Sequence, residues 1–153
     1  MAKILIINGP NLNMLGTRQP EIYGHTTLQD IEMSCKVLAA KLKLEVTFTQ
    51  SNFEGELVST IQKATNLYDG IIINAGGYTH SSIALRDALA LFSGKIIEVH
   101  VSNIYAREEF RHKSMLSSIS DGVIIGLGAH TYILAIRALS ELFFASQQNS
   151  QNY

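Results

Sequence analysis

The chain has 153 residues, of which 46% are hydrophobic and 16% are charged, and its formal net charge is −1. This length fits one domain with a sizeable core, and the apolar content excludes an intrinsically disordered chain. Because the basic residues are scattered, we expect no nucleic-acid partner and no membrane-surface partner. The one cysteine, Cys35, cannot form an internal disulfide and is read as a small core side chain.

The first residues lead directly into an apolar run and do not resemble a signal peptide. No apolar run reaches the length of a transmembrane helix. We therefore expect a cytoplasmic protein.

Five short apolar runs alternate with helical patterns along the chain. The runs cover residues 3–7, 45–50, 71–74, 95–101 and 122–125, and the helical patterns begin near residues 27, 54, 82 and 132. Thr27 followed by Asp30 supplies the N-capping chemistry of the first helix. The run at 45–50 alternates in polarity, which is typical of an outer strand. This order predicts a doubly wound α/β fold with a five-stranded parallel sheet in three layers, αβα.

We expect residues 1–146 to form a single domain. Residues 147–153 are rich in Gln, Asn and Ser, which predicts a disordered C-terminal tail.

Polar residues gather where three of the expected strands end. Residues 8–24 form a long loop, NGPNLNMLGTRQPEIYG, after a buried strand, and long ordered loops of this kind carry function. Residues 74–80 and 100–102 are also dense in Asn, His and Gly or Ser. Doubly wound folds bind ligands beyond the carboxyl ends of the strands, so we predict the functional site there.

Phosphate-binding and metal-binding signatures are missing from the sequence. No P-loop is present, and Gly126-Leu127-Gly128 lacks the third glycine of a dinucleotide fingerprint, so we interpret it as a tight turn. The histidines do not show the spacings of a strong metal site, and we expect no metal. No lysine ends an expected strand, which argues against Schiff-base chemistry.

Two arrangements could support acid–base chemistry. Glu98 and His100 are two residues apart on one strand, so they share a face and the carboxylate can fix the imidazole tautomer; a purely structural pair is the alternative. Tyr23 titrates too high to act as a base unless the phenolate is stabilised by about 4 kcal/mol. Arg18, in the same loop, could supply much of this, although Tyr23 could equally pack its ring on the core.

Three segments together closely resemble the type II 3-dehydroquinate dehydratases. They are NGPNLNMLGTRQPEIYG, INAGGYTHSSIALRDAL and IEVHVSNIYAREEFRHKS, they occur in family order, and the likeness extends from Ile4 to about Leu142. The resemblance implies a flavodoxin-like domain that reversibly dehydrates 3-dehydroquinate to 3-dehydroshikimate in the shikimate pathway, without cofactor or metal.

The resemblance also implies a role for each matching residue. Tyr23 would be the proton acceptor, with Arg18 lowering its pKa, and Asn11 would hold a water that stabilises the enolate. His100 would be the proton donor, with Glu98 behind it. The backbone amides of Val101 and Ser102 would bind the carboxylate of the substrate. Asn74, His80 and Arg111 would bind its hydroxyls. Arg107 would be the second cation of the lid.

Asp87 matches a family residue that reaches a neighbouring subunit's site. The resemblance therefore implies trimers, assembled as a homododecamer. The helix that carries Asp87 has more apolar residues than one buried face needs, which agrees with a subunit contact. Without the resemblance, Arg86 and Asp87 would read as a surface pair.

Two positions depart from the family pattern. Many relatives carry Glu where this chain has Gln19, and some carry Arg where it has Met14. Both departures affect what we expect of the motion of the lid, the part of the loop that carries Arg18 and Tyr23, and leave the expected reaction unchanged.

Two rival functions are a non-catalytic flavodoxin-like module that binds small molecules and a phosphate-eliminating synthase. No phosphate-binding loop is evident for the synthase.

Overall fold

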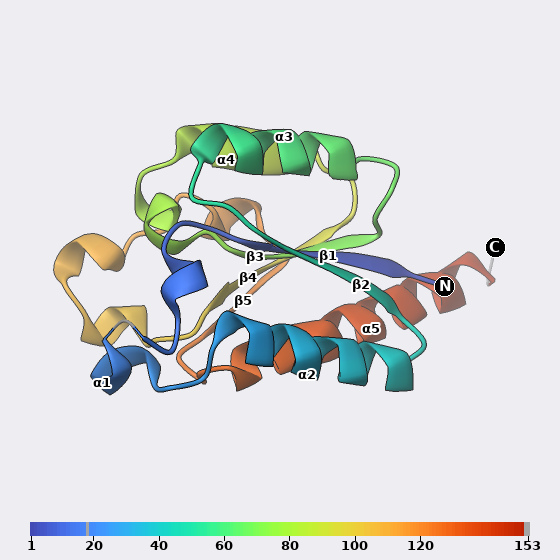
Figure 1. Cartoon of the computed structure of the whole chain (residues 1–153). Coiled ribbons are helices and arrows are strands. Elements are labelled where there is room, and N and C mark those ends of the chain that lie inside the picture. Colours follow the sequence, from blue (N-terminus) through green and yellow to red (C-terminus); the bar gives the residue numbers. More distant parts are fainter. Residues whose placement is uncertain (18, 152–153) are drawn as a thin grey trace.

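The computed structural model describes residues 1–17 and 19–151, and the side chains of Ile22 and Tyr23 lie outside the description. Within these residues the chain forms one sheet of five parallel strands with helices on both faces (Figure 1). The strands are β1 (Lys3–Asn8), β2 (Glu45–Gln50), β3 (Gly70–Asn74), β4 (Lys95–His100) and β5 (Gly122–Ile125). Their order is β2-β1-β3-β4-β5, the flavodoxin-like order. The predicted fold class is confirmed.

The helices form the two outer layers. Helices α2 (Leu28–Lys41) and α5 (His130–Ser150) cover one face of the sheet, and α3 (Glu54–Ala64) and α4 (Ile83–Ala90) cover the other (Figure 1). Alternate residues of β1 point to opposite faces, so Ile4 and Ile6 join one core and Leu5 and Ile7 join the other. This is why the central strands read as unbroken apolar runs, whereas β2 at the sheet edge alternates.

Local capping fixes where the helices begin. The Thr27 hydroxyl accepts the Asp30 N–H at 3.1 Å, and the Asp30 carboxylate accepts the Thr27 N–H at 3.0 Å, which completes a capping box before α2. The Ser82 hydroxyl accepts the Leu85 N–H at 3.0 Å and so caps the start of α4. Helix α3 ends at Ala64, shortly before Asn66, which adopts a left-handed conformation with φ of 68°.

Helix α5 is longer than predicted and ends at Ser150. Residues 147–150, placed by the sequence in a disordered tail, are therefore helical in the structure, while residues 152 and 153 lie outside the described residues. Residues 147–150 are exposed. The helix continues there because extending an existing helix adds a backbone hydrogen bond for each residue fixed.

Two polar stretches contain short helical turns that the sequence does not predict. The loop after β1 contains a 3₁₀ turn at Leu12–Met14 and the short helix α1 (Pro20–Tyr23). The segment between β4 and β5 contains 3₁₀ turns at Ile104–Ala106, Glu109–Arg111 and Ser117–Ile119. None of the helices in the described part of the chain has the length and apolar character needed to cross a bilayer.

Candidate active site

The candidate site lies at the switch point of the sheet, where chain connections leave β1 and β3 in opposite directions. Asn8 and Asn74 end these two strands and are partners in register. Between them stands Tyr132 of α5: its hydroxyl donates to Asn8 Oδ1 at 2.6 Å and accepts the Asn74 Nδ2–H at 3.0 Å. Asn8 Nδ2 in turn donates to the Thr49 carbonyl at 3.0 Å. A buried chain of hydrogen bonds thus sets the orientation of the Asn74 amide.

Tyr132 was not identified as a site residue from the sequence. Its ring lies in the core, where it tilts against Phe48 with centroids 6.3 Å apart, and burial raises the pKa of its hydroxyl. A tyrosine on the apolar face of a helix indicates that its buried hydroxyl has a hydrogen-bond partner. The indication is weak because it does not say which residue the partner is.

The loops after β1 and β3 approach each other backbone to backbone. The Gly9 N–H donates to the Asn74 carbonyl at 2.8 Å. A Cβ on Gly9 would lie 2.3 Å from the Ala75 carbonyl oxygen, so only glycine fits this position. The Asn74 side-chain oxygen accepts the Gly76 N–H at 3.2 Å, which completes the fixation of its amide.

Asn11 lies on a well-anchored part of the long loop. Its backbone has a φ of 68°, and its N–H donates to Asn52 Oδ1 at 3.0 Å. Leu12 and Leu15, which follow it, are buried. The loop's start is therefore held to the body of the domain by both a polar and an apolar contact.

The outer part of the same loop carries the proposed lid. Gly16 and Gly24 have φ of 90° and 73°, values that favour glycine. Tyr23 is the last residue of α1, but its side chain and the whole of Arg18 lie outside the described residues. Gln19 also has a positive φ, 46°, and Met14 is half exposed.

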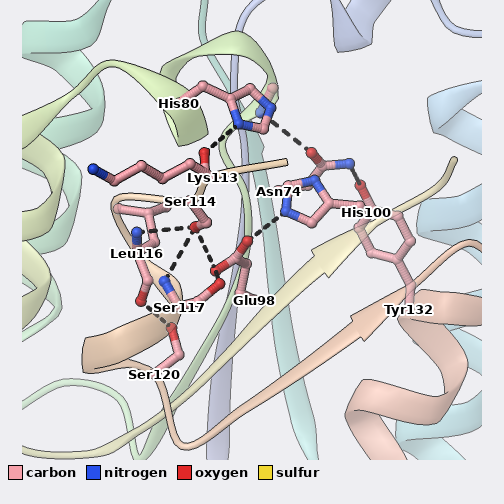
Figure 2. Close-up of polar contacts among 11 residues, drawn as sticks. Asn74, His80, Glu98, His100, Lys113, Ser114, Leu116, Ser117, Ser120 and Tyr132 are labelled. Atoms are coloured by element: carbon pink, nitrogen blue, oxygen red, sulfur yellow. Dashed lines mark hydrogen bonds and ion pairs between the residues drawn. The ribbon is translucent and has the colours of Figure 1, made fainter. Parts of the chain in front are cut away.

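Glu98 and His100 form a buried pair at the end of β4. His100 Nε2 lies 2.5 Å from Glu98 Oε2, and the other carboxylate oxygen accepts hydrogen bonds from Ser114 Oγ at 2.9 Å and Ser117 Oγ at 2.7 Å (Figure 2). Burial alone would raise the pKa of Glu98, but the hydrogen bonds from His100, Ser117 and Ser114 outweigh it and lower the pKa. Glu98 is therefore ionised, so the nitrogen that faces it carries a proton and Nδ1 remains for a ligand.

His80 stacks beside His100, with ring centroids 6.3 Å apart and an angle of 21° between the planes. Its Nδ1 lies 2.8 Å from the Lys113 carbonyl oxygen, which can only accept, so Nδ1 carries the proton. Burial lowers the pKa of His80; the bond to Lys113 opposes this, and the positive charges of His100 and Arg111 add to it. A neutral His80 offers the lone pair of Nε2 to a ligand hydroxyl.

These side chains surround a cavity of about 200 Å³. Its lining comes from the ends of β1, β3 and β4 and from the β4–β5 segment: Pro10, Asn11, Leu12, Leu15, Asn74, Gly76, Gly77, His80, His100, Val101, Ser102, Ile104, Arg107 and Arg111. The structure thus brings together eight of the residues predicted for the site: Asn11, Asn74, His80, His100, Val101, Ser102, Arg107 and Arg111.

Glu98 and Asp87, which were also predicted for the site, are not part of this lining. Glu98 is fully buried behind His100 and does not line the cavity. Asp87 is exposed on α4, as are Ile83 on the same helix and Leu91 directly after it, which are 61% and 75% exposed. Among the described residues, no three His, Cys, Asp or Glu side chains are grouped so that they could hold a metal ion.

Comparison with known proteins identifies the family. The family model described as Dehydroquinase class II matches residues 2–140. The chain belongs to this family. A 3-dehydroquinate dehydratase of Rhizobium johnstonii is 52% identical over 139 residues, covering 91% of this chain and 96% of the relative. Another, of Endomicrobium trichonymphae, is 54% identical over 142 residues, covering 93% and 99%.

Solved structures of type II dehydroquinases share the fold. The enzyme of Butyrivibrio crossotus has a TM-score of 0.88 and 48% identity, covering 90% of this chain and 97% of its own. The enzyme of Propionibacterium acnes has a TM-score of 0.89 and 40% identity, covering 92% and 97%. The resemblance inferred from the three motifs is confirmed, and this member of the dehydroquinase family is a lyase.

Proposed function

We propose that the chain catalyses the reversible dehydration of 3-dehydroquinate to 3-dehydroshikimate, a step of the shikimate pathway toward aromatic amino acids. The names of its relatives support this reaction. The observation that carries the proposal is the buried Glu98–His100 pair, whose imidazole lines the cavity at the switch point. An acid in that position is what the departure of a hydroxyl requires.

The first step is removal of a proton from the carbon beside the ketone. In our proposal Tyr23, as the phenolate, accepts this proton, and the Arg18 guanidinium stabilises the phenolate. The electron pair of the C–H bond moves toward the ketone oxygen and forms an enolate. A water held by Asn11 donates to that oxygen, and the anchored backbone of Asn11 supports such a fixed donor.

The second step is loss of the hydroxyl from the β carbon. The enolate re-forms the ketone, the new C=C bond forms, and the C–O bond breaks. The oxygen takes a proton from Nδ1 of the His100 imidazolium and leaves as water. Glu98 stabilises the imidazolium through Nε2, which leaves Nδ1 as the donor. We propose that the elimination is anti, which requires Tyr23 and His100 to act on opposite faces of the substrate ring.

The rest of the cavity holds the substrate in our proposal. The backbone amides of Val101 and Ser102 bind its carboxylate, and Asn74, His80 and Arg111 bind its hydroxyls. The cavity lining contains all five residues. The neutral His80 suits a hydroxyl donor, and the Asn74 amide is already fixed by Tyr132 and Gly76.

Closure of the loop at 16–24, together with Arg107, would exclude water and strengthen each of these interactions. Arg107 already lines the cavity. The reaction as proposed needs no cofactor and no metal, because the chain supplies the base and the acid and a water held by Asn11 is the enolate donor.

We further propose that the chain acts as a homododecamer of four trimers in the cytoplasm. Asp87 would reach the site of a neighbouring subunit. The exposure of Ile83 on α4 and of Leu91 directly after this helix supports a subunit contact there. Sedimentation velocity at micromolar protein tests the assembly, and a monomer would contradict it.

The direct test mixes purified protein with 3-dehydroquinate, without added cofactor, and follows the absorbance of the conjugated enone. A dehydratase produces this signal, whereas a non-catalytic binding module binds the substrate without it. Folded protein that shows no turnover would refute the proposal. Turnover that survives in Tyr23→Phe would refute the base assignment alone, and inactivation by borohydride with substrate would indicate a lysine imine instead.

A further inference from the structure

One short turn of the β4–β5 segment contacts His80 directly and is connected to His100 through Glu98. Residues 113–117, which we call the serine turn, place the Lys113 carbonyl on His80 and the hydroxyls of Ser114 and Ser117 on Glu98, the partner of His100 (Figure 2). The turn itself contributes no side chain to the cavity lining.

The hydrogen bonds of Ser114 fix the direction of its proton. Its oxygen accepts the N–H of Leu116 at 3.0 Å and the N–H of Ser117 at 3.1 Å. A hydroxyl oxygen has two lone pairs, so both are occupied and the O–H must point to its third neighbour, Glu98 Oε1. Ser114 can therefore act only as a donor to this carboxylate.

Ser117 adds a second donor at the same oxygen. Its hydroxyl lies 2.7 Å from Glu98 Oε1, and no other partner of this hydroxyl occurs among the described residues. With the His100 N–H on Oε2, three donors surround a carboxylate that is fully buried. Three hydrogen bonds of this kind replace the water that a buried carboxylate has lost.

The serine turn is firmly attached to the domain. The side chain of Leu116 is fully buried in the core against α3 and α4. The Met115 N–H donates to the Thr79 carbonyl at 2.8 Å, and Arg86 Nη1 of α4 donates to the Met115 carbonyl at 2.8 Å. The turn can thus serve as a rigid support rather than as a mobile loop.

We propose that the serine turn is the positioning element of the acid site, in which Ser114 and Ser117 hold Glu98 ionised and aimed at His100 while Lys113 fixes the tautomer of His80. The serines are positioning residues, since they act on the substrate only through Glu98 and His100. This inference rests on the proposed function, in which His100 is the acid. It predicts that loss of one serine hydroxyl alters the titration of the Glu98–His100 pair more than it alters substrate binding.

The decisive variant is Ser117→Ala, and Ser120→Ala is its matched control. Ser120 lies three residues further along, and its hydroxyl donates to the Leu116 carbonyl at 2.8 Å without touching the carboxylate. Ser117→Thr keeps the donor and should restore the wild-type behaviour. His80, Arg107 and Arg111, the charged and titratable residues that line the cavity with His100 in the described part of the chain, remain in every variant.

We expect Ser117→Ala to move the acid limb of the kcat–pH profile to higher pH by about one unit, because a donor to a charged group is lost. At neutral pH kcat should fall about tenfold while KM stays within about twofold. Ser120→Ala and Ser117→Thr should superimpose on the wild type. If Ser117→Ala does not fold, Ser117→Cys, which keeps a weak donor, should give about half the shift.

A pH profile of Ser117→Ala that superimposes on that of Ser120→Ala would overturn the inference. A wild-type protein without turnover would instead overturn the proposed function. In that case an NMR titration of the His100 imidazole tests the role of the serine turn. The pH-dependent step of the His100 signal that reports protonation of Glu98 should still move up by about one pH unit in Ser117→Ala and should not move in Ser120→Ala. No displacement of that step would refute the role of the serine turn.

Discussion

Replacing Tyr132 with phenylalanine removes one hydroxyl from the middle of the domain and leaves the ring in place. The hydroxyl connects Asn8 at 2.6 Å with Asn74 at 3.0 Å, and the three side chains are at most 4% exposed. The Tyr132 hydroxyl is fully buried and does not line the cavity, so water cannot take its place between the two asparagines. The variant therefore has an unpaired acceptor on Asn8 and an unpaired N–H on Asn74.

A buried polar group left without its partner costs about 1–3 kcal/mol, so two of them should lower the free energy of unfolding by about 2–6 kcal/mol. This is a large part of the about 5–15 kcal/mol that stabilises a typical domain. The Asn74 amide also loses the contact that orients it toward the cavity. We therefore expect KM to rise at least about fivefold, with a smaller effect on kcat.

Urea denaturation at a fixed protomer concentration measures the stability change, and fixed concentration matters because subunit assembly adds to stability. The matched control is Tyr78→Phe, which removes a hydroxyl that donates to the Asn52 carbonyl at 3.0 Å in an exposed position. That variant should lose less than about 1 kcal/mol. Equal losses in both variants, or a loss below about 1 kcal/mol in Tyr132→Phe, would refute the reasoning.

Three further predictions follow from burial and close packing. Gly9→Ala should destabilise the protein by at least about 2 kcal/mol, because its Cβ would lie 2.3 Å from the Ala75 carbonyl oxygen, whereas Gly55→Ala, with no atom within 4 Å, should be neutral or stabilising in urea titrations. The Cys35 thiol is fully buried with a pKa raised to about 12, so a thiol reagent should modify it only after unfolding; rapid labelling of the native protein would contradict this. Because folding lowers the pKa of Glu98 below its usual 4.5, its stabilising effect is complete above that pH and is lost as the pH falls below it. Acid titration should therefore destabilise the wild type more steeply than Glu98→Gln, and parallel curves would argue against an ionised Glu98.

The sheet could be predicted from the sequence because its strands are short and apolar. Both faces of β1 and β3 are covered, so their residues are apolar without interruption, and the expected strand bounds agree with the structure to within one residue. Helix starts with a polar cap, at Thr27 and Ser82, were also evident. The turns in the two polar stretches were not, because distant contacts hold them, such as the Asn52 side chain on the Asn11 backbone.

The candidate site was predictable where it depends on strand ends. Asn74 and His100 lie where parallel strands stop, so their convergence follows from the order of the elements. The supporting contacts could not be predicted in this way. Tyr132 meets Asn8 across 124 residues, and whether its hydroxyl reaches that strand end depends on how α5 docks on the sheet. Likewise, nothing in the polar segment distinguished Ser114 and Ser117 from the other serines before their contacts with Glu98 were seen.

The central claim is that His100, supported by Glu98, is the acid of a dehydration carried out in this cavity. Parallel measurement of kcat and of the substrate Kd in wild type and His100→Asn tests it most directly. An acid of this kind contributes about 10²–10⁴-fold, so kcat should fall by at least about 10²-fold while Kd changes only a few-fold. A variant that keeps kcat within about tenfold of the wild type would contradict the claim.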